Sequence, residues 1–330
     1  MDAGHAAVSV TGLTKRYGEV EAVRGIDLEV GRGETFGFLG PNGAGKSTTI
    51  NILCTLVAPT GGTARVAGHD VVADRAAVRR RIGLVFQEPT LDGPLSGEQN
   101  LRFHGELYGV DRRRAPARRE EVLRMVGLWD RRADPVGTYS GGMRRRLEIA
   151  RGLLHSPQVL FLDEPTIGLD PQTRASIWTY LAELRRTQDI TVFVTTHYMD
   201  EAEHCDRIAI MNEGRIVALD TPDALKAGVG ADRVTVTTAD DDAALRALAE
   251  DGLEGHRGSD GLSVAVQNGA GFVPRIVERL GRAGATVRTV SVTRPSLDDV
   301  FLSHTGTTIR DAESGRGPSM HPMALRMRGR

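Results

Sequence analysis

A glycine-rich segment followed by a lysine and two hydroxyl residues is the part of this sequence that points most directly to chemistry. Residues 40–48 read G-P-N-G-A-G-K-S-T and match the phosphate-loop pattern G-x-x-x-x-G-K-[ST]. Glycines let such a loop turn its backbone N–H groups toward anionic oxygens. Lys46 is expected to reach the β- and γ-phosphates of a nucleoside triphosphate, and the Ser47 hydroxyl to hold Mg²⁺. The predicted nucleotide-binding residues of this loop are Gly40, Pro41, Asn42, Gly43, Ala44, Gly45, Lys46, Ser47 and Thr48.

The segments on either side of the loop support this prediction. Residues 34–39 read as a β-strand, and the spacing of Ile50, Leu53 and Val57 predicts a helix after the loop. A strand–loop–helix context distinguishes a working phosphate loop from a chance match, and the helix start adds the positive end of its dipole. The alternative is a glycine-rich turn that carries a surface lysine.

Two adjacent carboxylates are candidates for the metal ligand and the general base that a phosphate loop alone does not provide. Asp163 and Glu164 follow the apolar run 159–162, which reads as a buried strand. At the end of such a strand Asp163 is held rigidly and is expected to bind Mg²⁺ directly or through water. Glu164 cannot share that geometry and is suited to orient and deprotonate an attacking water. The alternative, a strand that ends in two solvated acids, has no catalytic meaning.

Composition limits the remaining classes of function. The chain has 330 residues, enough for two or three domains, with 40% hydrophobic and 26% charged residues, as in ordinary globular proteins. A net charge of −1 gives no reason to expect nucleic-acid binding. Cys54 and Cys205 lie far apart in sequence, so a disulfide framework is not expected. The N-terminus lacks a secretory signal, and no apolar run reaches the ~18 residues of a spanning helix. Any membrane task would therefore belong to another chain.

The order of predicted elements describes an α/β protein with several parts. Paired strands are expected over residues 8–33, and the region 91–155 is expected to be mostly helical. Strands at 159–162 and 191–195 are short and apolar, as buried parallel strands are. A separate α/β domain of βαβαβ order is predicted over 229–305, and residues 306–330 are predicted to form a disordered tail.

A third motif makes the combination specific to one family. Ser140-Gly141-Gly142-Met143 precedes a helical pattern and resembles the LSGGQ signature of the ATP-binding cassette (ABC) ATPases. Together with the phosphate loop and the acid pair, it makes residues 8–226 similar to an ABC nucleotide-binding domain. The signature departs from the family pattern at Tyr139 and Met143, so any contact made by the usual glutamine side chain is in doubt.

The resemblance assigns further residues. Gln87 is similar to the Q-loop glutamine, which acts in catalysis and at the metal, and His197 resembles the catalytic switch histidine. Asp170 resembles the D-loop aspartate at the nucleotide site, and Tyr17 the aromatic residue that stacks on adenine. Ser140, Gly141 and Gly142 would grip the γ-phosphate at a helix start. Lys46 and Glu164 complete the catalytic set that the resemblance implies.

In this family the signature of one subunit faces the phosphate loop of another. The resemblance therefore implies a homodimer with two ATP molecules and Mg²⁺ at its interface, closed by ATP and opened by hydrolysis. It also implies a separately encoded membrane permease, contacted by the Gln87 loop and the helical region, and a peripheral location at the cytoplasmic face of the membrane. The implied fold is the P-loop ABC ATPase fold, with a parallel-sheet core, an antiparallel β subdomain, a helical subdomain and a small C-terminal α/β domain.

The subtype is indicated by two segments in the second half of the chain. Residues 195–203 (T-T-H-Y-M-D-E-A-E) and 296–302 (S-L-D-D-V-F-L) look like the ATPases of ABC-2-type exporters, in particular the daunorubicin-resistance and nodulation types. The predicted function is ATP hydrolysis that powers export of a drug, antibiotic or lipid-like molecule. The alternatives are an ABC ATPase that serves import, a soluble assembly factor, and a nucleotide-binding regulatory or translation-associated protein.

Overall fold

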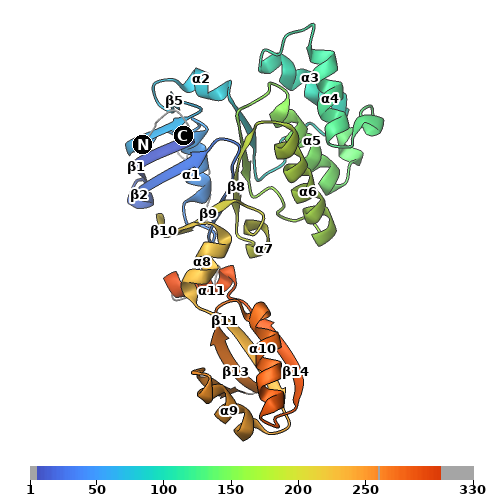
Figure 1. Ribbon diagram of the computed structural model, residues 1–330. Coiled ribbons are helices and arrows are strands. Elements are labelled where there is room, and N and C mark those ends of the chain that lie inside the picture. The colour runs from blue at the N-terminus through green and yellow to red at the C-terminus, as the bar shows by residue number, and fades with distance from the viewer. Residues whose placement is uncertain (1–5, 259–260, 306–330) are drawn as a thin grey trace. The chain divides into compact units, whose positions relative to one another are not determined.

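The chain divides after Pro222 in the computed structural model, which describes residues 6–258 and 261–305. The first unit contains three groups of elements, and the second unit begins at Asp223 (Figure 1). The tail predicted over 306–330 lies outside the described residues. Within the described ranges, no helix has the length and hydropathy that a membrane span requires.

A six-stranded sheet forms the centre of the first unit. Its strand order is β10-β9-β3-β8-β7-β6, and neighbours run parallel except for the antiparallel hairpin of β9 and β10. Every residue of β3, β7 and β8 is buried, which explains why these strands are short apolar runs. Because β3, β7 and β8 are parallel neighbours, the loops that follow them meet at one edge of the sheet. The strands are β3 (Thr35–Leu39), β6 (Ile82–Val85), β7 (Val159–Asp163), β8 (Thr191–Thr196), β9 (Arg207–Asn212) and β10 (Arg215–Asp220).

An antiparallel sheet of order β2-β1-β4-β5 packs beside this centre. Helix α1 (Lys46–Leu53) contacts β2 and β4 of this sheet and β7 of the central one, so it lies between the two sheets. The helix ends at Leu53, so Val57, which was expected to continue it, lies beyond its end. The other elements are β1 (Ala6–Tyr17), β2 (Val20–Gly31), β4 (Gly61–Val66), β5 (His69–Asp70) and α2 (Arg75–Arg79).

The predicted helical region follows β6. In Figure 1 its helices lie on the side of β8 opposite to α1. A capping box between Ser96 and Gln99 begins α3, and α5 packs against α3, α4, α6 and β6. The elements are α3 (Gly97–Leu107), α4 (Ala115–Met125), the 3₁₀ turns η1 (Trp129–Arg131) and η2 (Val136–Thr138), and α5 (Gly141–Leu153); α6 (Pro171–Thr187) and α7 (Met199–Ala202) follow β7 and β8.

The second unit is a four-stranded antiparallel sheet with helices, of order β12-β13-β11-β14. Its element order is βαββαβ, so the prediction of βαβαβ missed β12. That strand reads Gly-His-Arg-Gly and has no apolar residue to mark it. A capping box begins the last helix of this unit, because Ser296 N donates to Asp299 Oδ2 at 2.8 Å and Asp299 N donates to Ser296 Oγ at 3.2 Å. The elements are α8 (Pro222–Val229), β11 (Asp232–Thr238), α9 (Asp241–Glu250), β12 (Gly255–Gly258), β13 (Gly261–Val266), α10 (Gly269–Arg282), β14 (Val287–Thr293) and α11 (Leu297–Thr305).

Candidate functional site

The phosphate loop connects β3 to α1 and packs tightly against the backbone of two other strands. A Cβ atom at Gly40 would lie 2.2 Å from the carbonyl oxygen of Met211, and one at Gly45 would lie 2.4 Å from that of Ala22. Gly45 also has φ +107°, a conformation that side chains disfavour. Glycine is therefore required at both positions, because the backbone of other strands supports the loop at contact distance.

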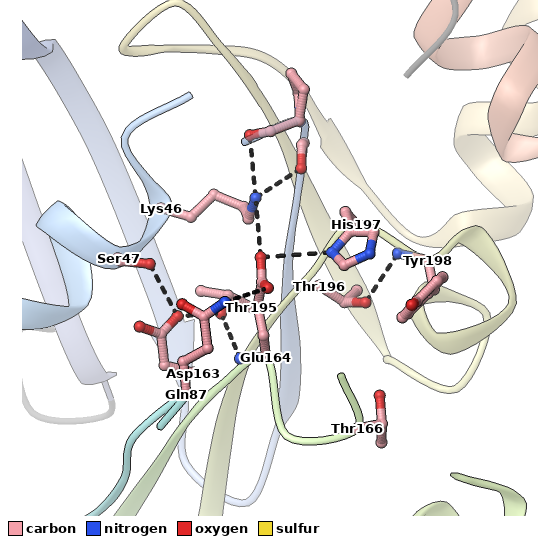
Figure 2. Close-up of polar contacts among 12 residues, drawn as sticks. Lys46, Ser47, Gln87, Asp163, Glu164, Thr166, Thr195, Thr196, His197 and Tyr198 are labelled. Atoms are coloured by element: carbon pink, nitrogen blue, oxygen red, sulfur yellow. Dashed lines mark hydrogen bonds and ion pairs between the residues drawn. The ribbon is translucent and has the colours of Figure 1, made fainter. Parts of the chain in front are cut away.

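Lys46 is buried at the first position of α1, with 4% of its surface exposed. Its Nζ donates to the carbonyl oxygens of Gly40 at 2.7 Å and Pro41 at 3.1 Å. The same nitrogen lies 3.5 Å from Oε1 of Glu164 (Figure 2). The structure thus places the lysine charge between the phosphate loop and the acid that follows β7.

Glu164 lies at the centre of this cluster, with 5% of its surface exposed. Besides Lys46, its carboxylate faces His197 Nδ1 at 3.5 Å and accepts a hydrogen bond from Gln87 Nε2 at 3.2 Å (Figure 2). The backbone of Glu164 has φ +45°, and its N–H donates to Thr195 Oγ1 at 3.0 Å. A non-glycine residue held in this region is strained and persists only where its surroundings determine it.

The charges around Glu164 decide its protonation state. Burial raises the pKa of this carboxyl, but the adjacent His197 side chain and the charge of Lys46 outweigh burial and leave the pKa below its ordinary value. Glu164 is therefore an ionised carboxylate at neutral pH.

Asp163, the last residue of β7, is directed toward the start of α1. Its Oδ1 accepts hydrogen bonds from Thr195 Oγ1 at 2.6 Å and from Ser47 Oγ at 3.1 Å (Figure 2). Burial raises the pKa of Asp163, and these two hydrogen bonds partly oppose that effect. The sequence expectation that Ser47 and Asp163 act together is therefore matched by their proximity.

The oxygen atoms of Ser47 and Asp163 suit a Mg²⁺ ion that takes its remaining ligands from a nucleotide and water, and not a metal ion that is bound by protein side chains alone. Within the described residues, no group of three or more His, Cys, Asp or Glu side chains is arranged to hold a metal ion. A hydroxyl and a carboxylate oxygen lie together at Ser47 and Asp163, and Mg²⁺ bound to nucleotides takes its other ligands from phosphate and water. Gln87, predicted as a third metal ligand, directs its amide nitrogen to Glu164 in this structure.

Tyr17 ends β1 and is half buried near the phosphate loop. Lys15 Nζ lies 4.8 Å from the centre of its ring. Burial raises the pKa of the Tyr17 phenol, and a hydrogen bond with the Thr48 side chain partly offsets this effect. The bond to Thr48 places the ring beside the first turn of α1.

The signature residues lie in another part of the unit. Ser140 caps α5 by accepting a hydrogen bond from Met143 N at 3.2 Å. A Cβ atom at Gly142 would lie 2.4 Å from Thr173 Cγ2, so α5 and α6 begin side by side. Asp170 caps α6 through Thr173 N at 3.0 Å. Figure 1 shows α5 and α6 on the side of β8 opposite to α1.

The structure also reveals polar residues that the sequence analysis did not single out. Thr195 bonds both Asp163 and the Glu164 backbone. Glu201 is buried and accepts hydrogen bonds from the hydroxyls of Thr166 and Thr196, the latter at 2.7 Å. A third such residue is Arg145 in α5, a buried arginine three residues before Glu148. Arg145 could have been found from the sequence, because Arg145 and Glu148 form a charged pair at i, i+3 on the apolar face of a predicted helix.

Comparisons with known proteins agree with this geometry. Residues 23–167 match the family model "ABC transporter", and residues 221–305 match "ATP-binding protein DrrA1-3-like, C-terminal domain". The chain is 43% identical to the daunorubicin resistance ATP-binding protein DrrA3 of Streptomyces coeruleorubidus, across 93% of this chain and 98% of the relative. It is 37% identical to the linearmycin resistance ATP-binding protein LnrL of Bacillus subtilis, across 91% and 98%.

Solved structures show the same fold for the first unit. CbiO1 of Clostridium perfringens, part of the ABC transporter complex cbiONQ, has a TM-score of 0.64 and 30% identity over 68% of this chain and 91% of its own. A dimeric ATP-binding cassette with ADP and Pi has a TM-score of 0.59 and 30% identity over 65% and 98%. The predicted ABC ATPase fold and ATPase activity are therefore confirmed at the level of the family. The chain belongs to the ATP-binding subunits of ABC transporters, in the group that includes the daunorubicin-resistance proteins.

Proposed function

We propose that this chain powers export of a drug, antibiotic or lipid-like molecule through a separate ABC-2-type permease. The observation that carries the proposal is the buried cluster of Lys46, Glu164 and His197, in a chain whose residues 221–305 match a DrrA-like C-terminal domain. The relatives that share both parts are named for resistance to daunorubicin, doxorubicin and linearmycin. We further propose residues 8–228, with a helical subdomain over 91–155, as the nucleotide-binding domain and 229–305 as a second domain.

Each site residue receives a role from its chemistry. The backbone N–H groups of residues 42–48 would bind the phosphates, with Gly40 and Pro41 shaping the start of the loop, and Lys46 would exchange its carbonyl partners for phosphate oxygens. Ser47, Asp163 and Gln87 would hold Mg²⁺, which when bound neutralises charge on the phosphate oxygens. The ring of Tyr17 would stack on adenine.

The hydrolytic step uses the ionised carboxylate of Glu164. Water attacks the γ-phosphorus, its proton passes to Glu164, and the bond from the γ-phosphorus to the bridging oxygen of ADP breaks. His197 donates to the γ-phosphate and keeps Glu164 ionised in the meantime. Gln87 reaches the same carboxylate at 3.2 Å and holds it in place. The basis for this assignment is that Lys46, Gln87 and His197 come from three separate segments of the chain and converge on one carboxylate.

The dimer would complete each site. Ser140 and Gly141 are exposed at the start of α5, where the helix dipole and bare N–H groups suit an anion. We propose that they bind the γ-phosphate held by the other subunit, with Gly142 setting the helix against α6 and Asp170 beside it at the interface. Hydrolysis would remove this γ-phosphate contact between the two subunits.

The permease would bind the helical region and the loop after β6. On α3, Phe103 and Leu107 are 56% and 66% exposed, which is unusual for large apolar side chains, and Phe86 beside Gln87 is also exposed. This contact would hold the chain at the cytoplasmic face of the membrane as a peripheral subunit. An import role is less consistent with the DrrA-like C-terminal domain.

The proposal is tested by purifying the tagged full-length chain from detergent-solubilised membranes. A polytopic membrane protein should co-purify, and the complex in inverted vesicles should take up daunorubicin or linearmycin only with ATP. The Lys46→Ala complex should assemble and fail to transport. Recovery with ribosomes or DNA and without a membrane protein would contradict export and favour the regulatory alternative.

A further inference from the structure

A buried arginine connects the signature helix to the turn that carries the catalytic carboxylate. Arg145 lies in the second turn of α5, five residues after Ser140, and is 6% exposed. Its Nη2 donates to the carbonyl oxygens of Asp163 at 3.2 Å and Glu164 at 3.0 Å, and its Nε donates to that of Pro165. One guanidinium therefore binds three consecutive carbonyls of the turn after β7.

The same guanidinium also reaches the Gln87 loop. Its Nη1 donates to the carbonyl oxygen of Phe86 at 2.6 Å and to Glu148 Oε2 at 2.9 Å. Glu148, which is also buried, accepts a hydrogen bond from Thr90 N at 2.9 Å. The Arg145–Glu148 pair thus binds the Gln87 loop at both of its ends, before and after the glutamine.

Arg145 supplies donors to these carbonyls from outside their own strand, and within the turn Ile167 N also donates to the Glu164 carbonyl oxygen at 3.3 Å. The sheet ladder ends with β7, and Glu164 at φ +45° turns the chain away from it. Buried carbonyl groups without a partner are costly, so the donors that α5 contributes stabilise this turn. Arginine suits the task because its planar fork offers five N–H donors, whereas a lysine ammonium is a single point with three.

We propose that Arg145 is a positioning residue for hydrolysis: it holds the Glu164 turn and the Gln87 loop to the signature helix. The orientation of the carboxylate then follows the position of α5, the helix whose start carries Ser140. Glu148 compensates the buried positive charge of Arg145 and orients the Arg145 guanidinium group. This inference rests on the proposed role of Glu164 as the group that orients water.

The test compares Arg145→Met and Arg145→Lys with the unmodified full-length chain. Both variants should lower kcat at least about tenfold, the equivalent of losing roughly one charge-assisted hydrogen bond in the transition state. The Kd for a fluorescent ATP analogue should stay within a factor of about three, because Arg145 does not touch the phosphate loop.

Arg118→Met is the matched control. Arg118 on α4 donates to the carbonyl oxygens of Leu153 at 2.6 Å and Leu154 at 3.4 Å, at the other end of α5. It has the same chemistry and lies away from Glu164, so its loss should lower the Tm and leave kcat within a factor of about two. An equal fall of kcat in Arg118→Met and Arg145→Met would overturn the proposal, because the effect would then be general loosening of α5.

A double-mutant cycle with Glu164→Gln shows whether Arg145 acts through Glu164. In the Glu164→Gln background, measured by single turnover, Arg145→Met should give little further loss. A full and equal loss in both backgrounds would overturn the inference and leave the role of Glu164 intact. Undiminished turnover in Glu164→Gln alone would instead reject the proposed base. If Arg145→Met does not fold, Arg145→Lys, which keeps the charge beside Glu148, decides the question in the same cycle.

Discussion

Lys46 Nζ lies 3.5 Å from Glu164 Oε1, and both side chains are buried. The lysine that is expected to bind phosphate therefore neutralises the carboxylate that is expected to activate water. When phosphate oxygens draw Lys46 away, Glu164 loses one of the two cationic or hydrogen-bonding groups that hold its pKa down. We infer that arrival of the nucleotide would raise the pKa of Glu164, the residue proposed to act on it.

Replacing Glu164 by Gln should abolish most hydrolysis. Loss of a general base lowers kcat by about 10²–10⁴-fold, and the amide keeps the size of the side chain. ATP binding should persist, so the variant should accumulate as an ATP-bound dimer. Phosphate release and size-exclusion chromatography with ATP measure both outcomes. Glu183→Gln, at an exposed pair with Arg186 on α6, is the control and should behave as the unmodified chain. Normal turnover in Glu164→Gln contradicts the assignment.

Replacing Lys46 by Ala should remove tight ATP binding. Its Nζ donates to the loop carbonyls of Gly40 and Pro41 and lies beside Glu164, so the truncation removes the charge that these groups share. Titration with a fluorescent nucleotide measures the change in Kd. The matched control is Lys226→Ala, whose Nζ pairs with Asp223 at 3.0 Å in the second unit and should leave ATP affinity unchanged. Equal affinity in both variants would reject the role of the loop.

Mixed dimers should show whether the phosphate loop of one subunit works with the signature of the other. Lys46→Ala lacks a working phosphate loop, and Ser140→Arg lacks a working signature at the start of α5. Each variant alone should be inactive, but a mixture should regain hydrolysis, because a mixed dimer holds one intact loop facing one intact signature. Removal of the Ser140 cap costs only about 1 kcal/mol, so the fold should survive. Failure to regain any activity, in a mixture shown to contain mixed dimers, argues against sites shared between subunits.

The pH dependence of hydrolysis should respond to His197. The folded-state pKa of Glu164 is lowered, so its ionised form stabilises the fold above the ordinary glutamate pKa of about 4.3, and that stabilisation is lost as pH falls through the lowered value. His197→Ala removes one of the two groups that counteract the effect of burial, so the pKa of Glu164 should rise. The acid limb of kcat/KM should therefore move to higher pH. His204→Ala, which removes a ring stacked on Trp178, should leave the acid limb in place. An unchanged acid limb in His197→Ala would show that another group titrates there.

Local sequence was enough to predict the residues of the candidate site and to identify the class of fold. The phosphate loop, the acid pair 163–164 and the apolar strands before them are contiguous, so their function depends on covalent neighbours and on backbone conformations that glycine and strand patterns reveal. The same reasoning placed a helix start at Ser140, because a helix start is a local event. It failed at β12, where no residue carries an apolar signal.

Tertiary structure alone decided how these segments meet. The approach of His197 and Gln87 to Glu164, the support of Gly40 by Met211, and the binding of three carbonyls by Arg145 join residues far apart in the chain. Such contacts depend on which strands are neighbours in the sheet and on how helices pack, and spacing along the sequence does not encode them. The role of a buried arginine follows from the carbonyls that it reaches, and only the folded chain supplies those.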